Sequence, residues 1–413
     1  MGGITPAELA AIRGRLEAFA DDIFASLPRT DQRARGGCYL RGLLLEGRRK
    51  SIEPMAARLG GEVHYQALHH FVAASPWDWR PVRRRLAEQL VAALEPVAWA
   101  VDDTGFPKDG DCSVGVQRQY CGTLGKTANC QLGVSVNAVT EQASCPLDWR
   151  LFLPERWGDD AKRRAACQVP QQVHHRSKWQ LVLDMVDELE GWGLRPPVLV
   201  ADAGYGEVGE FRQGLDDRQI GYVVQVKADT SAHPEQARPT VAPYTGRGRR
   251  SRPRYRGKPV SLKQLALAAG PSACMDLIWR RGSKGLQRSR FLVLQIRPAG
   301  ITPRRQAAAR ADGVGWELPL RWLLVEWPAS AVEPVKYWLS NLPDDTPMVE
   351  LVRLAKLRWR IEQDYRELKG ALGLDHFEGR SWPGWHHHVT LVSVAHGFLT
   401  LERLRRPQPA ASA

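Results

Sequence analysis

The spacing of apolar residues changes near residue 96, and this change constrains the fold more than any other feature of the sequence. Before it, apolar residues recur at intervals of three and four, as in PAELAAIRGRLEAFADDIF and PVRRRLAEQLVAALEP, which predicts helices over residues 1–90. After it come short apolar runs such as PVAWAVDD and CQLGVSVNAVT, which predict β-strands. A helical pattern over 171–192 then precedes a further apolar run at 197–201. This order favours a mixed α/β fold behind an all-helical N-terminal region.

The second half of the chain begins with a segment that shows neither the helical spacing of apolar residues nor the alternation typical of a strand. Residues 229–258 are rich in Pro, Gly and Arg, which predicts a mobile loop. Beyond it, three apolar runs predict strands: RFLVLQIR, RWLLVEWP and VKYWLSN. One long helix is predicted over about 348–369 and a final helix over about 386–405.

The charge balance points to an anionic partner. The chain has 58 Lys and Arg against 45 Asp and Glu, a net charge of +13, and only 12 of its basic residues are Lys, which leaves 46 Arg. Arginine presents a planar fork of donors that matches phosphate groups and guanine edges. A GC-rich genome favours Arg codons, but it does not explain the excess of positive over negative charge. Nucleic acid is therefore the simplest partner to expect.

Other features exclude several classes of protein. No apolar run approaches the roughly 18 residues that a membrane span needs, and the N-terminus has no signal-peptide core, so we expect a soluble, intracellular protein. The seven cysteines include no CxxC pair, so we expect reduced thiols in the core rather than a zinc site. His386, His387 and His388 have no carboxylate or thiol at metal-binding spacing, and we expect them to be mostly solvated.

Two short helices near the N-terminus resemble a helix-turn-helix. SIEPMAARL and HYQALHHFVA are separated by a Gly-Gly turn. Ordinary packed helices would give the same pattern, so both interpretations stay open. Nearby basic residues favour a DNA-facing domain, namely Arg48, Arg49, Lys50, Arg83, Arg84 and Arg85.

Acidic residues occupy positions where catalytic groups of α/β proteins gather. Asp102 and Asp103 end one predicted buried strand, and Asp202 ends another. Taken singly, an Asp at a strand end more often begins a turn or caps a helix. Glu362 lies in the long predicted helix, where an apolar stripe runs beside it.

The same helix carries cations on the Glu362 face. At about 100° per residue, Arg358, Tyr365 and Lys369 fall near Glu362. A ladder of exposed ion pairs would account for Arg358 and Glu362 alone. Their position at the edge of a buried face is also typical of a site.

Three segments resemble, in the right order, the conserved blocks of bacterial insertion-sequence transposases. They are VDDTGFPKDGDCSVGVQRQYCGTLGKTANCQLGVSV, VLVADAGYG and LRWRIEQDYRELKGALGLDHFEGRSW. These enzymes belong to the DDE endonuclease superfamily, and the resemblance implies an RNase H-like core with a β-rich insertion between the second Asp and the Glu. It covers the chain from about residue 96 to the end, whereas the N-terminal region matches in character only.

The resemblance implies roles for particular residues. Asp103, Asp202 and Glu362 would be the catalytic carboxylates that bind Mg²⁺, with Mn²⁺ as a substitute. Asp103 is preferred to Asp102, the alternative first Asp, because the first Asp of the family is followed directly by Thr, here Thr104.

It also implies residues that hold DNA phosphates. Arg358 and Lys369 fill the positions of the family's Arg and Lys. Ala355 stands where the family has a Tyr, a contact that Tyr365 could supply instead. The Arg-rich loop is a candidate DNA clamp, and Tyr255 within it could stack on a base; its candidate DNA-binding residues are Arg249, Arg250, Arg252 and Arg254.

The implied organisation has four parts. They are a helical DNA-binding domain (1–92), the first part of the RNase H-like core (93–228), the β-rich insertion with the Arg-rich loop (229–345) and the C-terminal helices that complete the core (346–413).

The implied function is DNA transposition. Such a protein would bind the terminal inverted repeats of an insertion sequence, cleave DNA with a metal ion and transfer the strand to double-stranded target DNA. A homodimer in the synaptic complex and a cytoplasmic, nucleoid-associated location are expected. Two alternatives stay open: a metal-dependent endonuclease without strand transfer, and a catalytically retired DNA-binding regulator. A glycosidase that uses Asp102 and Asp103 is a poor alternative, because adjacent strand residues point to opposite faces.

Overall fold

The computed structural model describes residues 5–247, 253–282, 285–310 and 317–405. The chain forms two compact units, and β1 (Ala98–Pro107) contributes to both. Unit 1 comprises the chain up to Val97, Val101–Arg195 and the part from Trp359 onward. Unit 2 comprises Ala98–Ala100 and Pro196–Arg358. We describe each unit by itself.

Unit 1 begins with the predicted helical region. Its helices are α1 (Pro6–Ile23), α2 (Thr30–Leu44), α3 (Ile52–Arg58), α4 (Tyr65–Ala73) and α5 (Trp79–Leu94). The first helix starts where the sequence supplies a capping box, because Thr5 and Glu8 bond each other's backbone amides. Helices α3 and α4 confirm the two short helices predicted there. Gly60 and Gly61 between them have φ angles of 64° and 88°, which glycine adopts without strain.

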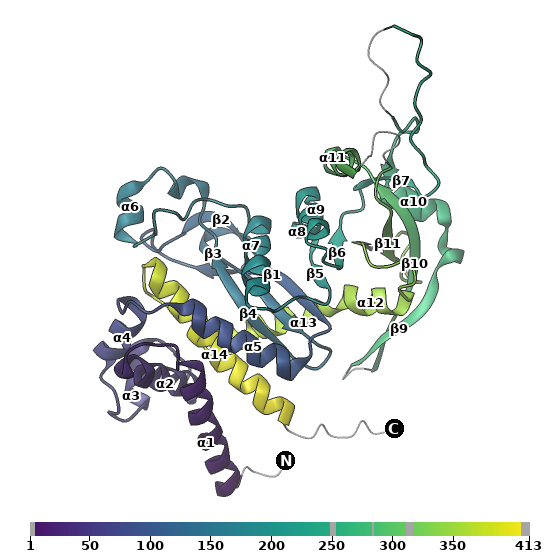
Figure 1. Ribbon diagram of the computed structural model, residues 1–413. Helices are drawn as coiled ribbons and strands as arrows, with labels where there is room; N and C mark the ends of the chain where they lie inside the picture. The colour runs from purple at the N-terminus through teal and green to yellow at the C-terminus, as the bar shows by residue number, and fades with distance from the viewer. Residues whose placement is uncertain (1–4, 248–252, 283–284, 311–316, 406–413) are drawn as a thin grey trace. The chain divides into compact units, whose positions relative to one another are not determined.

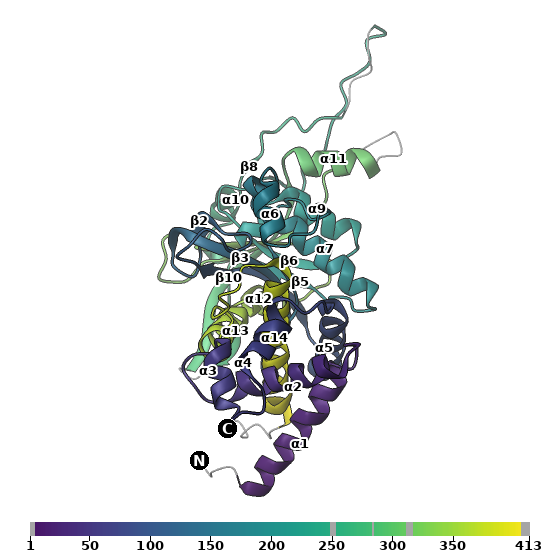
Figure 2. The same cartoon turned by 90° about the vertical axis from the view of Figure 1, so that its left-hand side faces the viewer.

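The sheet of unit 1 is antiparallel (Figure 1). Strands β2 (Gln117–Cys121) and β4 (Ser144–Leu151) pair with successive parts of β3 (Lys126–Val139), and β1 is the other neighbour of β3. Helix α7 (Lys178–Gly191) packs on β3 and β4. Helix α14 (Trp382–Arg405) packs on β4, α5 and α2, and Figure 2 shows it beside α2. The short α6 (Ala161–Ala166) and α13 (Trp359–Gly370) complete the unit.

Unit 2 is built on a sheet in which β5 (Leu199–Ala201) runs parallel to β6 (Tyr222–Val226). The antiparallel strands that follow in the sheet are β12 (Lys336–Ser340), β11 (Arg321–Glu326), β10 (Gly285–Pro298), β7 (Ser231–Pro234) and β8 (Val260–Ser261), and β9 (Met275–Gly282) also pairs with β10. Its helices are α8 (Ala203–Gly206), α9 (Gly209–Asp217), α10 (Leu262–Ala269), α11 (Ile301–Arg310) and α12 (Met348–Leu357). The predicted fold class is confirmed, since a helical N-terminal region precedes a mixed α/β core and strands lie between Asp202 and Glu362.

The single helix predicted over 348–369 is wrong. Helix α12 ends at Leu357, α13 starts at Trp359, and Arg358 between them keeps helical dihedrals of −57° and −25°. The physical reason lies in what each half packs against. Helix α12 packs on β9 and β6 of unit 2, whereas α13 packs on β4 and α14 of unit 1.

The expectation that His386, His387 and His388 are solvated is also wrong. Each is at most 2% exposed, because neighbours surround α14. The ring of His388 lies 3.1 Å from the hydroxyl of Tyr39 and 3.1 Å from the carbonyl oxygen of Gly373. Burial lowers the pKa of His388 to about 4.

Among the described residues, no helix is long and apolar enough to cross a membrane.

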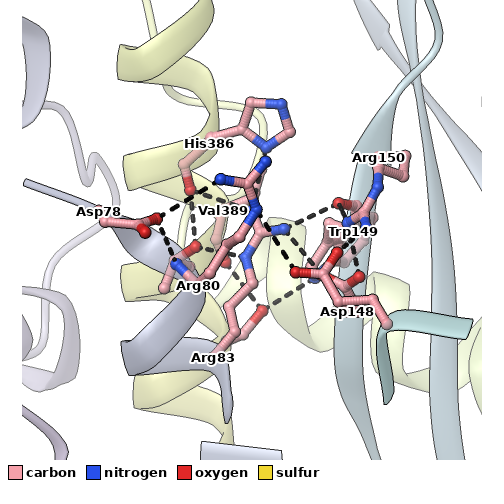
Figure 3. A network of polar contacts seen from close by, with 11 residues as sticks. Asp78, Arg80, Arg83, Asp148, Trp149, Arg150, His386 and Val389 are labelled. Carbon is pink, nitrogen blue, oxygen red and sulfur yellow. Dashed lines mark hydrogen bonds and ion pairs between the residues drawn. The ribbon is translucent and has the colours of Figure 1, made fainter. Parts of the chain in front are cut away.

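Arg83, expected to face DNA, lies instead in the interior of unit 1 (Figure 3). Its guanidinium donates to Oδ1 of Asp148 at 2.8 Å, to the carbonyl oxygen of Trp149 at 2.8 Å and to Oγ1 of Thr390 at 2.7 Å. It also lies 3.2 Å from Nδ1 of His386. Burial lowers the pKa of Arg83 to about 10, against the attraction of Asp148, so the side chain stays charged at neutral pH. Arg83 and Asp148 therefore form a charged ion pair in the interior of unit 1.

Lys50 is a second basic residue that the sequence placed on a DNA-facing surface and the structure buries. Its ammonium donates to the carbonyl oxygens of Leu43 and Leu45, which end α2. Arg84 and Arg85 are exposed and pair with Glu88 and Asp22.

We predict that Arg83→Met strongly destabilises the protein. Removing Arg83 leaves Oδ1 of Asp148 without its buried partner, while Arg150 still pairs with Oδ2, so we expect the low end of the loss for a broken buried ion pair, about 3 kcal/mol. The free energy of unfolding from urea titration measures this loss. Arg84→Ala, which removes the neighbouring exposed arginine, should change it by no more than about 0.5 kcal/mol. Equal effects of the two substitutions would contradict a structural role for the buried pair.

The burial of His388 predicts a pH dependence of stability. Between its unfolded pKa of about 6.5 and its folded pKa of about 4, the unfolded chain binds a proton that the folded chain excludes. The free energy of unfolding should therefore fall as the pH drops from 7 to 4, with about 3 kcal/mol from this group. His388→Gln, which keeps a donor and an acceptor, should make that fall smaller. An unchanged slope would contradict the assignment.

Candidate active site

Asp102 and Asp103 do not end the predicted strand, because β1 continues to Pro107; they lie in its middle, at its two half-buried positions. The carboxylate of Asp103 is 21% exposed and lies 2.9 Å from the ammonium of Lys178. Oδ1 of Asp102 accepts a hydrogen bond from the backbone N–H of Asp103 at 2.8 Å. The ion pair with Lys178 orients the oxygens of Asp103.

Sequence reasoning missed Lys178. It is the first residue of α7, directly after the capping residue Ser177. The sequence pattern predicts a helix over 171–192 and so places Lys178 inside it, whereas α7 begins at Lys178; nothing local indicates a partner 75 residues away.

Asp202 follows β5 and caps α8. Its Oδ1 accepts a hydrogen bond from the N–H of Gly204 at 2.9 Å, so the turn fixes the side chain. Gly206 lies so close to β6 that a Cβ atom there would overlap the carbonyl oxygen of Gln225. The DAGYG segment therefore needs glycine at Gly206 for a packing reason, and it holds Asp202 at the strand end.

Glu362 lies in the first turn of α13, with its side chain exposed. The adjoining face of this helix is buried and includes Ile361, Tyr365 and Leu368. Tyr365 is 9% exposed, and its hydroxyl lies 2.7 Å from that of Ser135 on β3. Tyr365 thus packs into the core and is not positioned on the exposed face with Glu362.

Lys369 joins α13 to β1. Its ammonium donates to the carbonyl oxygen of Gly105 at 2.7 Å and to Oγ1 of Thr123 at 2.8 Å. Burial lowers the pKa of Lys369, and the charge of Asp375 opposes that shift. Gly105 is two residues beyond Asp103. Within unit 1, the helix that carries Glu362 is therefore bonded to the strand that carries Asp103.

The three predicted carboxylates are divided between the units. Asp103 and Glu362 belong to unit 1, and Asp202 belongs to unit 2. Across the described ranges, no group of three or more His, Cys, Asp or Glu side chains is arranged to hold a metal ion. The chemistry of the donors still suits Mg²⁺, which prefers oxygen ligands and one or two carboxylates. That Asp103, Asp202 and Glu362 hold it stays a prediction from the sequence.

The other predicted DNA-binding residues have different positions. Arg358 is half-buried and is the last residue of unit 2. Arg254 has an exposed side chain, and its backbone pairs with Thr240 through hydrogen bonds of 2.9 and 3.0 Å. Arg249, Arg250 and Arg252 lie outside the described residues.

Tyr255, proposed from sequence as a base-stacking residue, is held within unit 2. Its hydroxyl accepts a hydrogen bond from the N–H of Leu318 at 2.9 Å, and its ring stacks on His233 at 4.7 Å. These contacts give the ring a structural role.

Comparison with known proteins supports the resemblance. Residues 22–286 match a family model described as DDE superfamily endonuclease. The chain is also 30% identical over 191 residues to the probable transposase for insertion sequence element IS701 from Microchaete diplosiphon. That alignment covers 46% of this chain and 47% of the relative, so the chain spans about half the length of the curated relative it matches.

We predict that Gly206→Ala destabilises unit 2 by about 1–3 kcal/mol, because the carbonyl oxygen of Gln225 is backbone and cannot easily move. Gly191→Ala is the matched control, since nothing lies within 4 Å of the added carbon at the end of α7. It should be neutral or stabilising by about 0.5–1 kcal/mol. Chemical denaturation measures both, and a neutral Gly206→Ala would contradict the packing argument.

Proposed function

The chain belongs to the DDE superfamily of endonucleases, and from this membership we propose that it is a DNA transposase. In this proposal it binds the terminal inverted repeats of an insertion sequence, cleaves DNA with a divalent metal ion and transfers the freed 3′ end to target DNA. The observation that carries the proposal is the bonding of α13 to β1 beside Asp103, through Lys369 and Gly105.

The similarity to a probable insertion-sequence transposase supports transposition over other endonuclease activities. The order of the sequence blocks supports it independently, since Asp103, Asp202 and Glu362 follow one another as in those transposases.

The proposed chemistry uses carboxylate oxygens to hold Mg²⁺, which Mn²⁺ could replace. When bound, divalent ions activate a water and stabilise the leaving oxygen of a phosphodiester. Lys178 orients Asp103 through their ion pair. The N–H of Gly204 orients Asp202. Glu362 presents its carboxylate from an exposed helix turn whose other face is fixed in the core.

Basic residues would bind the DNA backbone. An ammonium has three donors, and Lys369 uses two of them on Gly105 and Thr123, which leaves one for a phosphate oxygen. Arg358 and Arg254 are the further phosphate-binding candidates. We also propose that residues 1–92 contact DNA, that two copies act together in the synaptic complex and that the protein works at the nucleoid in the cytoplasm.

We predict that Asp103→Ala, Asp202→Ala and Glu362→Ala each reduce Mg²⁺-dependent cleavage of inverted-repeat DNA by about a thousandfold, because each removes a metal ligand whose contribution is several kcal/mol. Binding of the uncut DNA should be largely kept. A gel assay with an end-labelled duplex measures cleavage, and a mobility shift in Ca²⁺ measures binding.

Asp109→Ala is the matched control, because Asp109 is an exposed aspartate shortly after β1. It should cleave at the normal rate. Full cleavage by any of the three carboxylate variants would overturn the proposed site.

A strand-transfer assay separates the proposal from its closest alternative. A pre-nicked inverted-repeat end should become joined to target DNA with the wild-type protein. Cleavage without joining would identify an endonuclease that does not transfer strands. Metal-independent DNA binding with no cleavage at all would identify a retired regulator.

A further inference from the structure

The antiparallel strands β2 and β3 form a hairpin whose end, residues 120–126, is the hairpin tip (Figure 1). Tyr120, the residue before the end of β2, is 65% exposed. Leu124, in the loop between the strands, is 44% exposed. Two large apolar residues are therefore exposed at the same end of the hairpin, and the proposed cleavage chemistry gives neither of them a role.

The hairpin tip is fastened to the strand that carries Asp103. Oγ1 of Thr123 donates to the carbonyl oxygen of Gly105 at 3.1 Å, and the ammonium of Lys369 donates to both of these oxygens. Sγ of Cys121 lies so close to Gly105 that a Cβ atom there would overlap it. Gly105 is two residues beyond Asp103 on β1, which is about 7 Å along the strand. Within unit 1, the hairpin tip therefore lies beside one of the proposed metal ligands.

The loop of the hairpin tip has a defined conformation. The N–H of Leu124 donates to the carbonyl oxygen of Cys121 at 3.0 Å, and the N–H of Gly125 donates to that of Gly122 at 3.3 Å. Gly125 has a φ angle of 63°, which glycine adopts without strain. Among the described residues, nothing lies within 4 Å of a Cβ atom added at Gly122 or Gly125, so the loop is open on both sides of Leu124. An ordered and open loop of this kind loses little conformational entropy when it binds a partner.

The hairpin carries only positive charge. Residues 112–140, which include all of β2 and β3, contain Arg118 and Lys126 but no Asp or Glu. Both cations are exposed, and within the described ranges neither forms an ion pair. Arg118 and Tyr120 are two residues apart, so they share one face of β2. The exposed ring therefore has a cation beside it on the same strand face.

This combination favours DNA over a protein partner. Proteins that bind single strands use cations along the backbone and aromatic rings on which bases stack. A second copy of the chain has a net charge of +13, so a patch of the same sign would repel it. A phosphate held by Lys369 would lie within about 6 Å of Oγ1 of Thr123, because that ammonium is 2.8 Å from Thr123 and hydrogen bonds are about 2.8 Å long. DNA bound by Lys369 would thus reach the hairpin tip.

We propose that the hairpin tip binds an unpaired base of the DNA next to the phosphate that is cleaved. The ring of Tyr120 stacks on this base, Leu124 packs beside it, and Arg118 and Lys126 bind the flanking phosphates. The base is unpaired because a base inside a duplex is covered by its neighbours on both faces. This inference rests on the proposed function, but it uses none of the proposed metal ligands, so the two can be tested separately.

A mobility shift in Ca²⁺ tests the proposal with two inverted-repeat duplexes, one fully paired and one with unpaired bases at the cleavage end. Tyr120→Ala should weaken binding of the unpaired end about tenfold, which is the effect expected for one stacked base, and should change binding of the paired duplex much less. Tyr120→Phe keeps the ring and should bind within about twofold of the wild type. Leu124→Ala should give a smaller loss in the same direction, and it keeps the test valid if Tyr120→Ala does not fold.

Leu267→Ala is the matched control, because Leu267 is a leucine of α10 that is 41% exposed and lies in unit 2. It should bind both duplexes as the wild type does. Equal binding of the unpaired end by the wild type, Tyr120→Ala and Leu124→Ala would overturn the proposal. Loss of self-association by Tyr120→Ala in sedimentation, with DNA binding unchanged, would also overturn it and identify a second copy as the partner.

Asp103→Ala separates this inference from the proposed function. That variant should not cleave DNA but should keep the preference for the unpaired end, and adding Tyr120→Ala should remove the preference. Cleavage by the wild type with no preference that depends on Tyr120 would overturn the hairpin contact and leave the proposed function standing. A preference that depends on Tyr120, without cleavage by the wild type in Mg²⁺, would support the hairpin contact and overturn the proposed catalysis.

Discussion

The buried ion pair between Arg83 and Asp148 holds together segments that are far apart in the sequence. Arg83 comes from α5 of the helical region, Asp148 from β4 of the sheet, and Thr390, which accepts from Arg83, from α14. Removing two charges from water is costly, so such a pair persists only when further hydrogen bonds complete it. Here the carbonyl oxygen of Trp149 supplies one of them. Because β4 pairs with β3 and β1 is the other neighbour of β3, the strand that carries Asp103 depends on this packing.

The same sheet gives α13 one fixed face and one exposed face. Tyr365 meets Ser135 of β3, and its ring lies 6.0 Å from that of Trp149, which is next to Asp148. Lys369 meets the backbone of β1. The exposed Glu362 therefore belongs to a helix whose other side is anchored by polar contacts. A carboxylate that must meet a metal ion and DNA gains a defined position in this way without being buried itself.

Some features of the fold and of the candidate site could be predicted from the sequence, and others could not. The strands β1 and β5 and the aspartates on or after them followed from apolar runs and turn residues, which are local signals. The break at Arg358 was not local, because it reflects two packing partners on either side of one residue. The burial of Arg83 did leave a signal. Positions 83, 86, 90 and 94 recur at helical spacing and are all buried, so Arg83 lies on the apolar stripe of α5 whereas Arg84 and Arg85 do not. The sequence had no signal that the partner of Arg83 is Asp148, because the two residues are 65 positions apart.

The buried pair also determines the tautomer of His386. Arg83 donates to Nδ1 of His386, and this makes Nε2 the proton-bearing nitrogen. Asp148 also holds Arg150 at 2.5 Å. A single buried carboxylate thus positions Arg150 directly and, through Arg83, determines which nitrogen of the histidine carries the proton.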